Sequence, residues 1–235
     1  MPDREALRGR FETQLVFGEI FNVAEEKDGW CKGTCAHDGY AGYVEKQHLS
    51  PKITPATHIV TAARSHIYRD ADIKSPLVAT LGFGSAISLI EETEKYARLD
   101  TGEWLYKQDV SSTALLDRDY AATAKKFLET PYYWGGRSGF GIDCSGLVQV
   151  CLARAGIPAP RDTEQQINAV GEAAGMPKKG DIVFFPAHVG IMTDDANMIH
   201  ANAFHMKVTI EPVEIVSARG GKITAVRRLP GYPQS

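Results

Sequence analysis

The residues with the clearest capacity for chemistry are the four at 143–146, DCSG. They follow a glycine-rich stretch at 134–141 and precede an apolar run that begins at Leu147. This pattern predicts a loop that opens a helix, with Cys144 in the first helical turn. Free N–H groups and the helix dipole should lower the pKa of a thiol there. Cys144 is therefore a candidate nucleophile, although a small buried cysteine at a helix start has the same pattern.

Two downstream histidines could supply a base and an orienting group. His188 begins the run HVGIM, His200 lies in the run MIHAN, and a polar stretch at 193–197 separates the two runs. Such a pattern predicts an antiparallel hairpin. The odd loop length should place both histidines on one face, opposite or diagonal to each other. A cysteine beside two histidines on one face can act as nucleophile, base and orienting group.

Other periodic segments should position these groups. An amphipathic helix is predicted from Leu115 to Leu128, ended by Pro131, and a short helix from Asp162. The run GDIVFFP at 180–186 should form a strand before His188, with a break or sheet edge at Pro186. Two more strands are predicted at 208–211 and 223–229. The fold class predicted for this part of the chain is α+β.

The first 113 residues have a different pattern, with short apolar runs separated by turn residues. This pattern is typical of small β-barrels, and it occurs twice, which indicates tandem copies. A proline-containing linker at 50–55 separates the copies. We therefore predict three domains, at 1–52, 56–112 and 114–235, the first of them with little room for an opening strand.

Composition narrows the classes of function. The 235 residues are 43% hydrophobic and 23% charged, as in an ordinary globular protein, and the net charge is −3. We therefore expect no nucleic-acid partner. No apolar run approaches the length of a membrane span, and the first ten residues lack the apolar core of a signal peptide, so we expect no membrane partner and a cytoplasmic location.

Six short motifs, in order, resemble those of the NlpC/P60 cysteine peptidases. They are YYWGG at 132–136, GIDCSG at 141–146, PRDT at 160–163, GDIVF at 180–184, HVGI at 188–191 and IHA at 199–201. The resemblance covers roughly residues 115–235 and implies a papain-like fold that cleaves cell-wall peptides. The two preceding repeats resemble bacterial SH3-like (SH3b) domains. The fold class that this implies is a papain-like catalytic domain after two small SH3-like β-barrels.

The resemblance also implies residue roles. Cys144 matches the nucleophile, His188 the base and His200 the third polar residue, while Tyr132 matches a tyrosine that assists at the oxyanion. Tyr132 could instead be an aromatic residue packed behind the site. The family needs no metal or other cofactor, so none is expected here.

SH3b-bearing members of the family select murein peptides that have a free L-Ala amine. Their resemblance to this chain implies a cysteine endopeptidase that hydrolyses the γ-D-Glu–diamino acid bond of L-Ala-γ-D-Glu-diamino acid peptides during wall-peptide recycling. The residues implied in substrate binding are Glu19, Tyr40, Trp134, Asp143, Ser145, Arg161, Asp162 and Thr163. For Arg161 the implied partner is either the amine end of the groove or the D-Glu carboxylate. Glu19 and Asp162 could instead be a solvated acid and a helix cap.

Alternatives remain open at this point. The same scaffold could carry an amidase or acyltransferase that acts on another amide, because fold does not fix substrate. The chain could also be an inactive module that binds wall peptides. Cys31 and Cys35, followed by His37, could form a zinc site or a regulatory disulfide, but no second pair completes four zinc ligands, and chance placement near a strand end is favoured.

Overall fold

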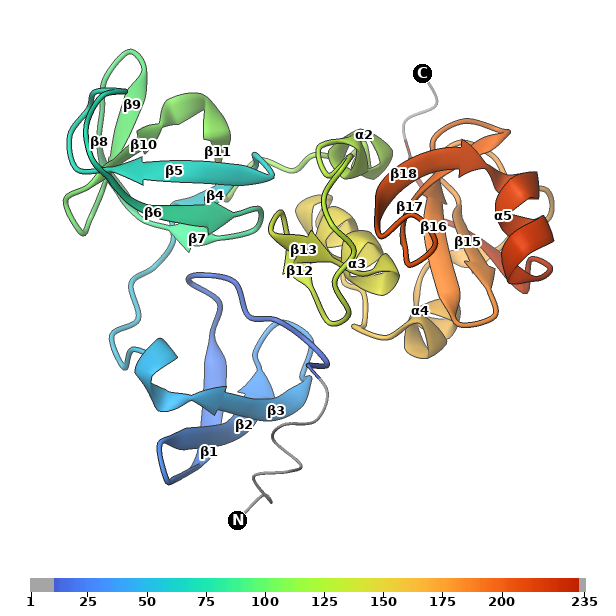
Figure 1. Cartoon of the computed structure of the whole chain (residues 1–235), viewed down its shortest axis with the longest axis horizontal. Coiled ribbons are helices and arrows are strands. Elements are labelled where there is room, and N and C mark those ends of the chain that lie inside the picture. Colours follow the sequence, from blue (N-terminus) through green and yellow to red (C-terminus); the bar gives the residue numbers. More distant parts are fainter. Residues whose placement is uncertain (1–10, 233–235) are drawn as a thin grey trace. The chain divides into compact units, whose positions relative to one another are not determined.

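The computed structural model describes residues 11–232 and divides the chain into two compact units, Met1–Thr113 and Ala114–Ser235 (Figure 1). The predicted division of the first unit at 50–55 stays a prediction. The first ten residues, which the sequence predicts to lack a signal core, lie outside the described residues, as do 233–235. Within the described part, no helix has the length and apolar character needed to cross a membrane.

The first unit consists of short antiparallel strands. One sheet has the order β1-β2-β3, a second has the order β6-β5-β10-β9-β8, and a third has the order β11-β4-β7. The strands are β1 Phe21–Lys27, β2 Trp30–Cys35, β3 Ala41–Glu45, β4 His58–Val60, β5 Arg64–Tyr68, β6 Leu77–Gly82, β7 Ala86–Ile87, β8 Leu89–Glu92, β9 Tyr96–Leu99, β10 Trp104–Tyr106 and β11 Val110–Ser112. Two 3₁₀ turns, Lys46–His48 and Lys107–Asp109, follow β3 and β10.

In the second and third sheets, buried and exposed side chains alternate along the strands, and the buried ones form a shared core. In β9, Ala97 and Leu99 are buried while Tyr96 and Arg98 are half-exposed, which is the period of two expected for a strand with one buried face. Leu105 from β10 and Ile67 from β5 join them in one apolar cluster. Cys31 and Cys35 are buried free thiols in β2, and the described residues contain no group of three or more His, Cys, Asp or Glu side chains placed to hold a metal ion.

The second unit is built on a six-stranded antiparallel sheet of order β14-β19-β15-β16-β17-β18 (Figure 1). Its strands are β14 Glu172–Ala173, β15 Ile182–Phe185, β16 His188–Met192, β17 Asn197–Asn202, β18 Lys207–Pro212 and β19 Ala225–Arg228. A two-stranded ribbon, β12 Arg137–Ser138 and β13 Gly141–Ile142, lies apart from this sheet. The helices are α2 Tyr120–Lys125, α3 Cys144–Arg154, α4 Thr163–Ala169 and α5 Val213–Gly220.

Helix α3 is the central helix of this unit. All but one of its residues are buried, and it packs against β16, β17 and α2. The glycine-rich stretch before it forms the β12–β13 ribbon, where a Cβ on Gly136 would lie 2.3 Å from the Gly141 carbonyl oxygen. Only glycine allows this close approach, which brings the loop against the helix start.

The helix predicted at 115–128 is wrong in length. Only Tyr120–Lys125 is α-helical. Asp119 is the N-cap of this helix, and its side chain accepts a hydrogen bond from the Ala122 N–H. Before it, Arg154 donates to the Leu115 carbonyl and to Asp117, which holds that segment outside the helix. The apolar spacing that favoured a longer helix therefore includes residues that are exposed, Leu115 among them.

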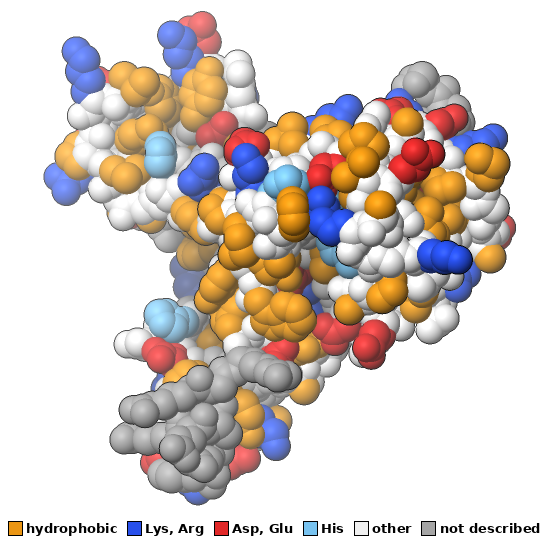
Figure 2. Space-filling view, turned by 45° about the vertical axis from the view of Figure 1, so that its right-hand side comes forward, with side chains coloured by type: hydrophobic (Ala, Val, Ile, Leu, Met, Phe, Trp, Pro, Cys, Tyr) orange, Lys and Arg blue, Asp and Glu red, His pale blue; other side chains and the backbone are white. Residues whose placement is uncertain are grey.

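The predicted hairpin is confirmed, because β16 and β17 are antiparallel and Met192 pairs with Met198. A second hairpin precedes it: Phe185 pairs with His188 across a two-residue turn in which Ala187 has a positive φ of 55°, so the break predicted at Pro186 is a chain reversal. Figure 2 shows basic, acidic and hydrophobic side chains interspersed on the face it presents, in keeping with the small net charge.

Candidate active site

Cys144 begins α3, as the sequence predicts, and Asp143 is the N-cap. The Asp143 carboxylate accepts a hydrogen bond from the Gly146 N–H at 2.7 Å and from the Gly135 N–H at 2.8 Å. The Cys144 side chain is nearly enclosed, with 8% of the residue exposed. A thiol is thus held at a helix start that a carboxylate already caps.

The direction of the thiol pKa differs from the sequence-based expectation. Burial, followed by the nearby Asp143 charge, raises the pKa of Cys144 to about 11. Hydrogen bonds from the backbone N–H groups of Val189 and Ser145 and from the Thr163 hydroxyl favour the thiolate, but they are outweighed. The expectation of a lowered pKa was wrong because it counted the helix terminus and left out enclosure by the sheet.

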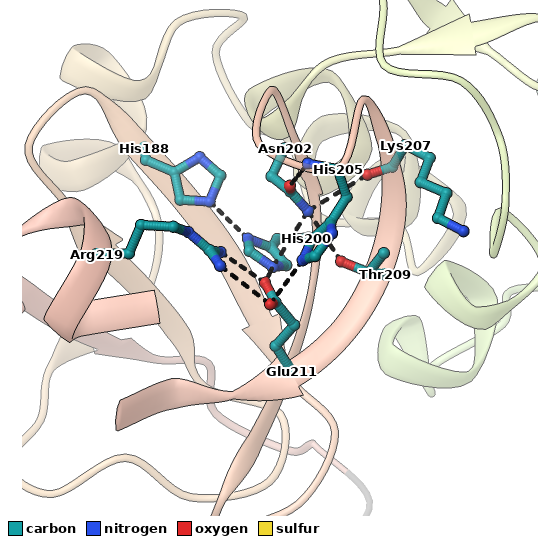
Figure 3. Close-up of polar contacts among 8 residues, drawn as sticks. All are labelled: His188, His200, Asn202, His205, Lys207, Thr209, Glu211 and Arg219. Atoms are coloured by element: carbon teal, nitrogen blue, oxygen red, sulfur yellow. Dashed lines mark hydrogen bonds and ion pairs between the residues drawn. The ribbon is translucent and has the colours of Figure 1, made fainter. Parts of the chain in front are cut away.

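The two histidines lie on one face of the β16–β17 hairpin (Figure 3). The register places His200 two positions from the residue opposite His188, so the pair is diagonal. The Nε2 atom of His188 lies 2.7 Å from the Nδ1 atom of His200. His200 is fully buried, α3 packs against β16 and β17, and the Val189 N–H beside His188 is near enough to the Cys144 sulfur to act on the pKa of the thiol. The hairpin and the helix start therefore bring the thiol and the imidazole pair to one place.

Both rings are held in their neutral form. Burial lowers the pKa of His188 to about 4, and the neighbouring His200 and Arg219 act in the same direction. Burial also lowers the pKa of His200, against the opposing effect of Glu211. A neutral imidazole can accept a proton, so His188 is in the protonation state that a general base requires.

The polar network extends beyond the residues that the sequence indicated. Glu211 on β18 places Oε2 2.9 Å from His200 Nε2 and Oε1 2.8 Å from His205 Nε2. Arg219 on α5 donates to both carboxylate oxygens, at 3.1 and 2.6 Å (Figure 3). The alternation of Thr209 and Glu211 along a predicted strand is the one sequence signal that could have marked Glu211 as facing His200.

A buried ion pair fixes the other side of the helix start. The Arg161 guanidinium donates to the Asp143 carboxylate at 2.5 and 3.0 Å and to the Ser145 hydroxyl at 2.8 Å. Arg161 is 2% exposed and Asp143 is 5% exposed. These three residues, which the sequence associates with substrate, thus bind one another around Cys144.

Comparisons with known proteins identify the parts of the chain. Residues 129–219 match the model of the NlpC/P60 family, and residues 4–49 match the model described as bacterial dipeptidyl-peptidase Sh3 domain, of which 4–10 lie outside the described residues. The second unit contains an NlpC/P60 domain. An SH3 domain of the bacterial dipeptidyl-peptidase type precedes it.

The chain is similar to relatives along most of their length. The chain is 29% identical to the γ-D-glutamyl-L-lysine dipeptidyl-peptidase of Bacillus subtilis, over 81% of this chain and 72% of the relative. It is 24% identical to dipeptidyl-peptidase 6 of Lysinibacillus sphaericus, over 88% of this chain and 86% of the relative. The crystal structure of an NlpC/P60 family protein from Bacillus cereus superposes with a TM-score of 0.80 at 27% identity, covering 94% of this chain and 82% of that one.

The predicted resemblance and fold class are therefore confirmed: the protein is a cysteine peptidase with an NlpC/P60 domain after SH3-like β structure. The roles of individual residues stay predictions, and the structure adds their surroundings. Tyr132 is half-buried, and burial, followed by the Cys144 charge, raises the pKa of its hydroxyl to about 12. That hydroxyl remains protonated and able to donate at neutral pH.

The remaining predicted substrate residues of the NlpC/P60 domain lie at loop ends and element starts. Trp134 is 60% exposed in the glycine-rich stretch. Asp162 precedes α4 without capping it through its side chain, and Thr163 is the first residue of that helix. The Thr163 hydroxyl acts to lower the pKa of the Cys144 thiol, an influence that the motif match did not predict.

Glu19 and Tyr40 belong to the first unit. The Glu19 carboxylate accepts from the Val16 N–H at 2.9 Å and lies 3.7 Å from the imidazole of His37. The Tyr40 N–H donates to Asp38, whose carboxylate also pairs with His37 at 3.1 Å. The predicted contribution of Glu19 and Tyr40 to the substrate pocket stays a prediction.

Proposed function

We propose that this protein is a cysteine endopeptidase that hydrolyses the γ-D-Glu–diamino acid bond of murein peptides with a free N-terminal L-Ala. The observation that carries the proposal is the Cys144, His188 and His200 constellation, with 2.7 Å between the two rings, in a chain similar over most of its length to γ-D-glutamyl-L-lysine dipeptidyl-peptidases. A dipeptidyl-peptidase releases an N-terminal dipeptide, so the scissile amide lies two residues from a free amine.

The proposed reaction begins with proton transfer. His188 takes the proton of Cys144 as the sulfur attacks the carbonyl carbon of the γ-amide. Negative charge develops on the carbonyl oxygen, where the backbone N–H of Cys144 at the start of α3 and the Tyr132 hydroxyl are the candidate donors. The protonated His188 then delivers its proton to the nitrogen of the diamino acid as the C–N bond breaks.

The second half of the proposed reaction restores the enzyme. The thioester joins Cys144 to the γ-carbonyl of D-Glu, and water attacks it while His188 accepts the water proton. Breakage of the C–S bond releases L-Ala-γ-D-Glu, and His188 returns its proton to the sulfur, which restores the thiol. Each step requires only a thiol, an imidazole and oxyanion donors from this chain.

We further propose that an acidic residue recognises the free amine. Ammonium groups require acceptors, and Asp162, which is half-buried at the start of α4, is a candidate. A requirement for a free amine would exclude peptides still attached to the glycan. The proposed role is therefore recycling of released peptides in the cytoplasm, which cell fractionation would test directly.

The experiment compares three substrates at equal concentration of cleavable bonds: free L-Ala-γ-D-Glu-L-Lys, its N-acetylated form and purified sacculi. We expect cleavage of the free tripeptide. Blocking the amine should lower kcat/KM on the order of a hundredfold or more, because the acceptors that pair with the ammonium group lose their partner. Equal cleavage of all three substrates would refute the free-amine requirement. If the Cys144 thiol is reactive but none of the three substrates is cleaved, an amidase or acyltransferase that acts on another amide is favoured.

A further inference from the structure

Glu211 is the end of a hydrogen-bonded chain that begins at the proposed base. His188 Nε2 contacts His200 Nδ1 at 2.7 Å, and His200 Nε2 contacts Glu211 Oε2 at 2.9 Å (Figure 3). The β17–β18 register pairs His200 with Thr209 and Met198 with Glu211, so Glu211 is diagonal to His200 on a neighbouring strand. The three side chains thus come from three adjacent strands, β16, β17 and β18.

Glu211 is ionised across the working range of pH. Arg219 donates to both of its oxygens, and His205 contacts Oε1. These partners hold the pKa of the Glu211 carboxyl at about 2 against the opposing effect of burial. The Phe204 ring lies 4.2 Å from the Arg219 guanidinium carbon, a cation–π contact that supports the position of Arg219. The carboxylate carries no proton and can only accept hydrogen bonds.

An acceptor at this position determines where the protons lie on both rings. The contact with Glu211 Oε2 requires the proton of His200 to be on Nε2. A neutral His200 then has a lone pair on Nδ1, so the proton of His188 must be on its Nε2. The remaining nitrogen of His188, Nδ1, is left with a lone pair and is the atom able to accept a proton from a thiol.

A second polar group near His200, the Asn202 amide, does not change these proton positions. The amide nitrogen of Asn202 lies 3.4 Å from His200 Nε2, but it donates to the Thr209 hydroxyl at 2.9 Å and to the Lys207 carbonyl at 3.3 Å. The orientation of the amide is fixed because its oxygen accepts from the His205 N–H at 2.8 Å. Asn202 therefore has better acceptors than the ring, and Glu211 is the partner of Nε2.

We propose that Glu211, held by Arg219, is a positioning residue that fixes the Nε2–H tautomer of both His200 and His188 and so leaves His188 Nδ1 as the base. This inference rests on the proposed function for its meaning in turnover. The carboxylate also lies two hydrogen bonds from the imidazolium that forms when His188 accepts a proton, and its charge favours that state. Glu211 acts through His200 and has no contact with His188 among those that the described residues make.

The first experiment needs no variant and no substrate. Two-dimensional ¹H–¹⁵N spectra of the ring nitrogens of His188 and His200 in the full chain at neutral pH report the tautomer directly. We expect a protonated Nε2 and an unprotonated Nδ1 on both rings. A spectrum with the proton on Nδ1 of either ring would overturn the proposal.

The second experiment compares variants in the ring spectra, in alkylation of Cys144 by iodoacetamide and in tripeptide turnover. Glu211→Gln presents both a donor and an acceptor to His200, so we expect mixed tautomers, slower alkylation and a decrease in kcat on the order of a hundredfold at unchanged KM. Glu211→Asp, which keeps the carboxylate, should recover part of the rate. The matched control is Glu214→Gln, which changes an exposed residue at the start of α5 and should match the wild type.

The outcomes separate this inference from the proposed function. Predicted ring spectra with no tripeptide cleavage would refute the function and support the tautomer assignment. Wild-type tautomers, alkylation and kcat in folded Glu211→Gln would overturn the positioning role. If Glu211→Gln does not fold, the spectra of the wild-type rings decide alone.

Discussion

Replacing Arg161 with methionine tests whether the buried ion pair at the start of α3 is structural. The substitution leaves the Asp143 carboxylate, only 5% exposed, without its cation. Removing one partner of a buried pair costs about 3–5 kcal/mol. Asp143 keeps the N–H groups of Gly135 and Gly146 at 2.8 and 2.7 Å, so we expect the lower end of that range, about 3 kcal/mol of unfolding free energy.

The same substitution should change the chemistry of the neighbouring thiol. The Asp143 charge already raises the pKa of Cys144. Without the Arg161 guanidinium, which is 2.5 Å from Asp143, that charge is less compensated and the thiol pKa should rise further. We therefore expect slower alkylation of Cys144 at a fixed pH in protein that is still folded.

The assay is urea denaturation at pH 7, combined with alkylation and steady-state kinetics. Lys207→Met is the control, because it removes an exposed ion pair with Glu129 in the same unit and should cost under about 1 kcal/mol. Adding Asp143→Asn to Arg161→Met removes the unpaired charge while keeping a good N-cap, so the double variant should be more stable than the single one. Wild-type stability with a raised KM in Arg161→Met would refute the structural role and favour direct binding of substrate.

Two further predictions concern the cysteines. Cys144→Ala should abolish turnover at nearly unchanged stability, and turnover by this variant would contradict the assignment of the nucleophile. Cys151 is fully buried on α3, so Cys151→Ala should retain activity and lose about 1 kcal/mol or more of unfolding free energy in urea denaturation. Alkylation of Cys144 should rise steadily toward pH 11, because burial raises the thiol pKa above its ordinary value and the thiolate fraction grows as pH increases. A plateau above pH 5 would instead indicate a thiolate already paired with imidazolium.

The sequence was sufficient for elements whose pattern is local. The glycine-rich turn before an apolar run predicted that a helix begins at Cys144, and the polar stretch at 193–197 predicted the hairpin that brings the two histidines together. Both depend on backbone preferences within a few residues. The helix predicted at 115–128 was wrong because Asp119 provides a stronger start signal than the apolar spacing before it.

The parts that the sequence did not reveal depend on tertiary surroundings. Glu211 is eleven residues from His200, and only the β17–β18 register shows that the two side chains meet. Arg219 reaches Glu211 from α5, a helix that no motif indicated. The thiol pKa depends on enclosure by the sheet, which a helix-terminus rule does not include.

The directions of the two pKa shifts bear on how the nucleophile forms. Burial favours the neutral thiol of Cys144 and the neutral imidazole of His188, so proton transfer between them before substrate binds is unfavourable. The proton is then most easily moved as the sulfur attacks, because the developing bond to carbon removes the charge from sulfur. A mechanism of this kind requires the acceptor nitrogen of His188 to be in place in advance. The chain from His188 through His200 to Glu211 meets that requirement, since it fixes which nitrogen carries the lone pair before the substrate arrives.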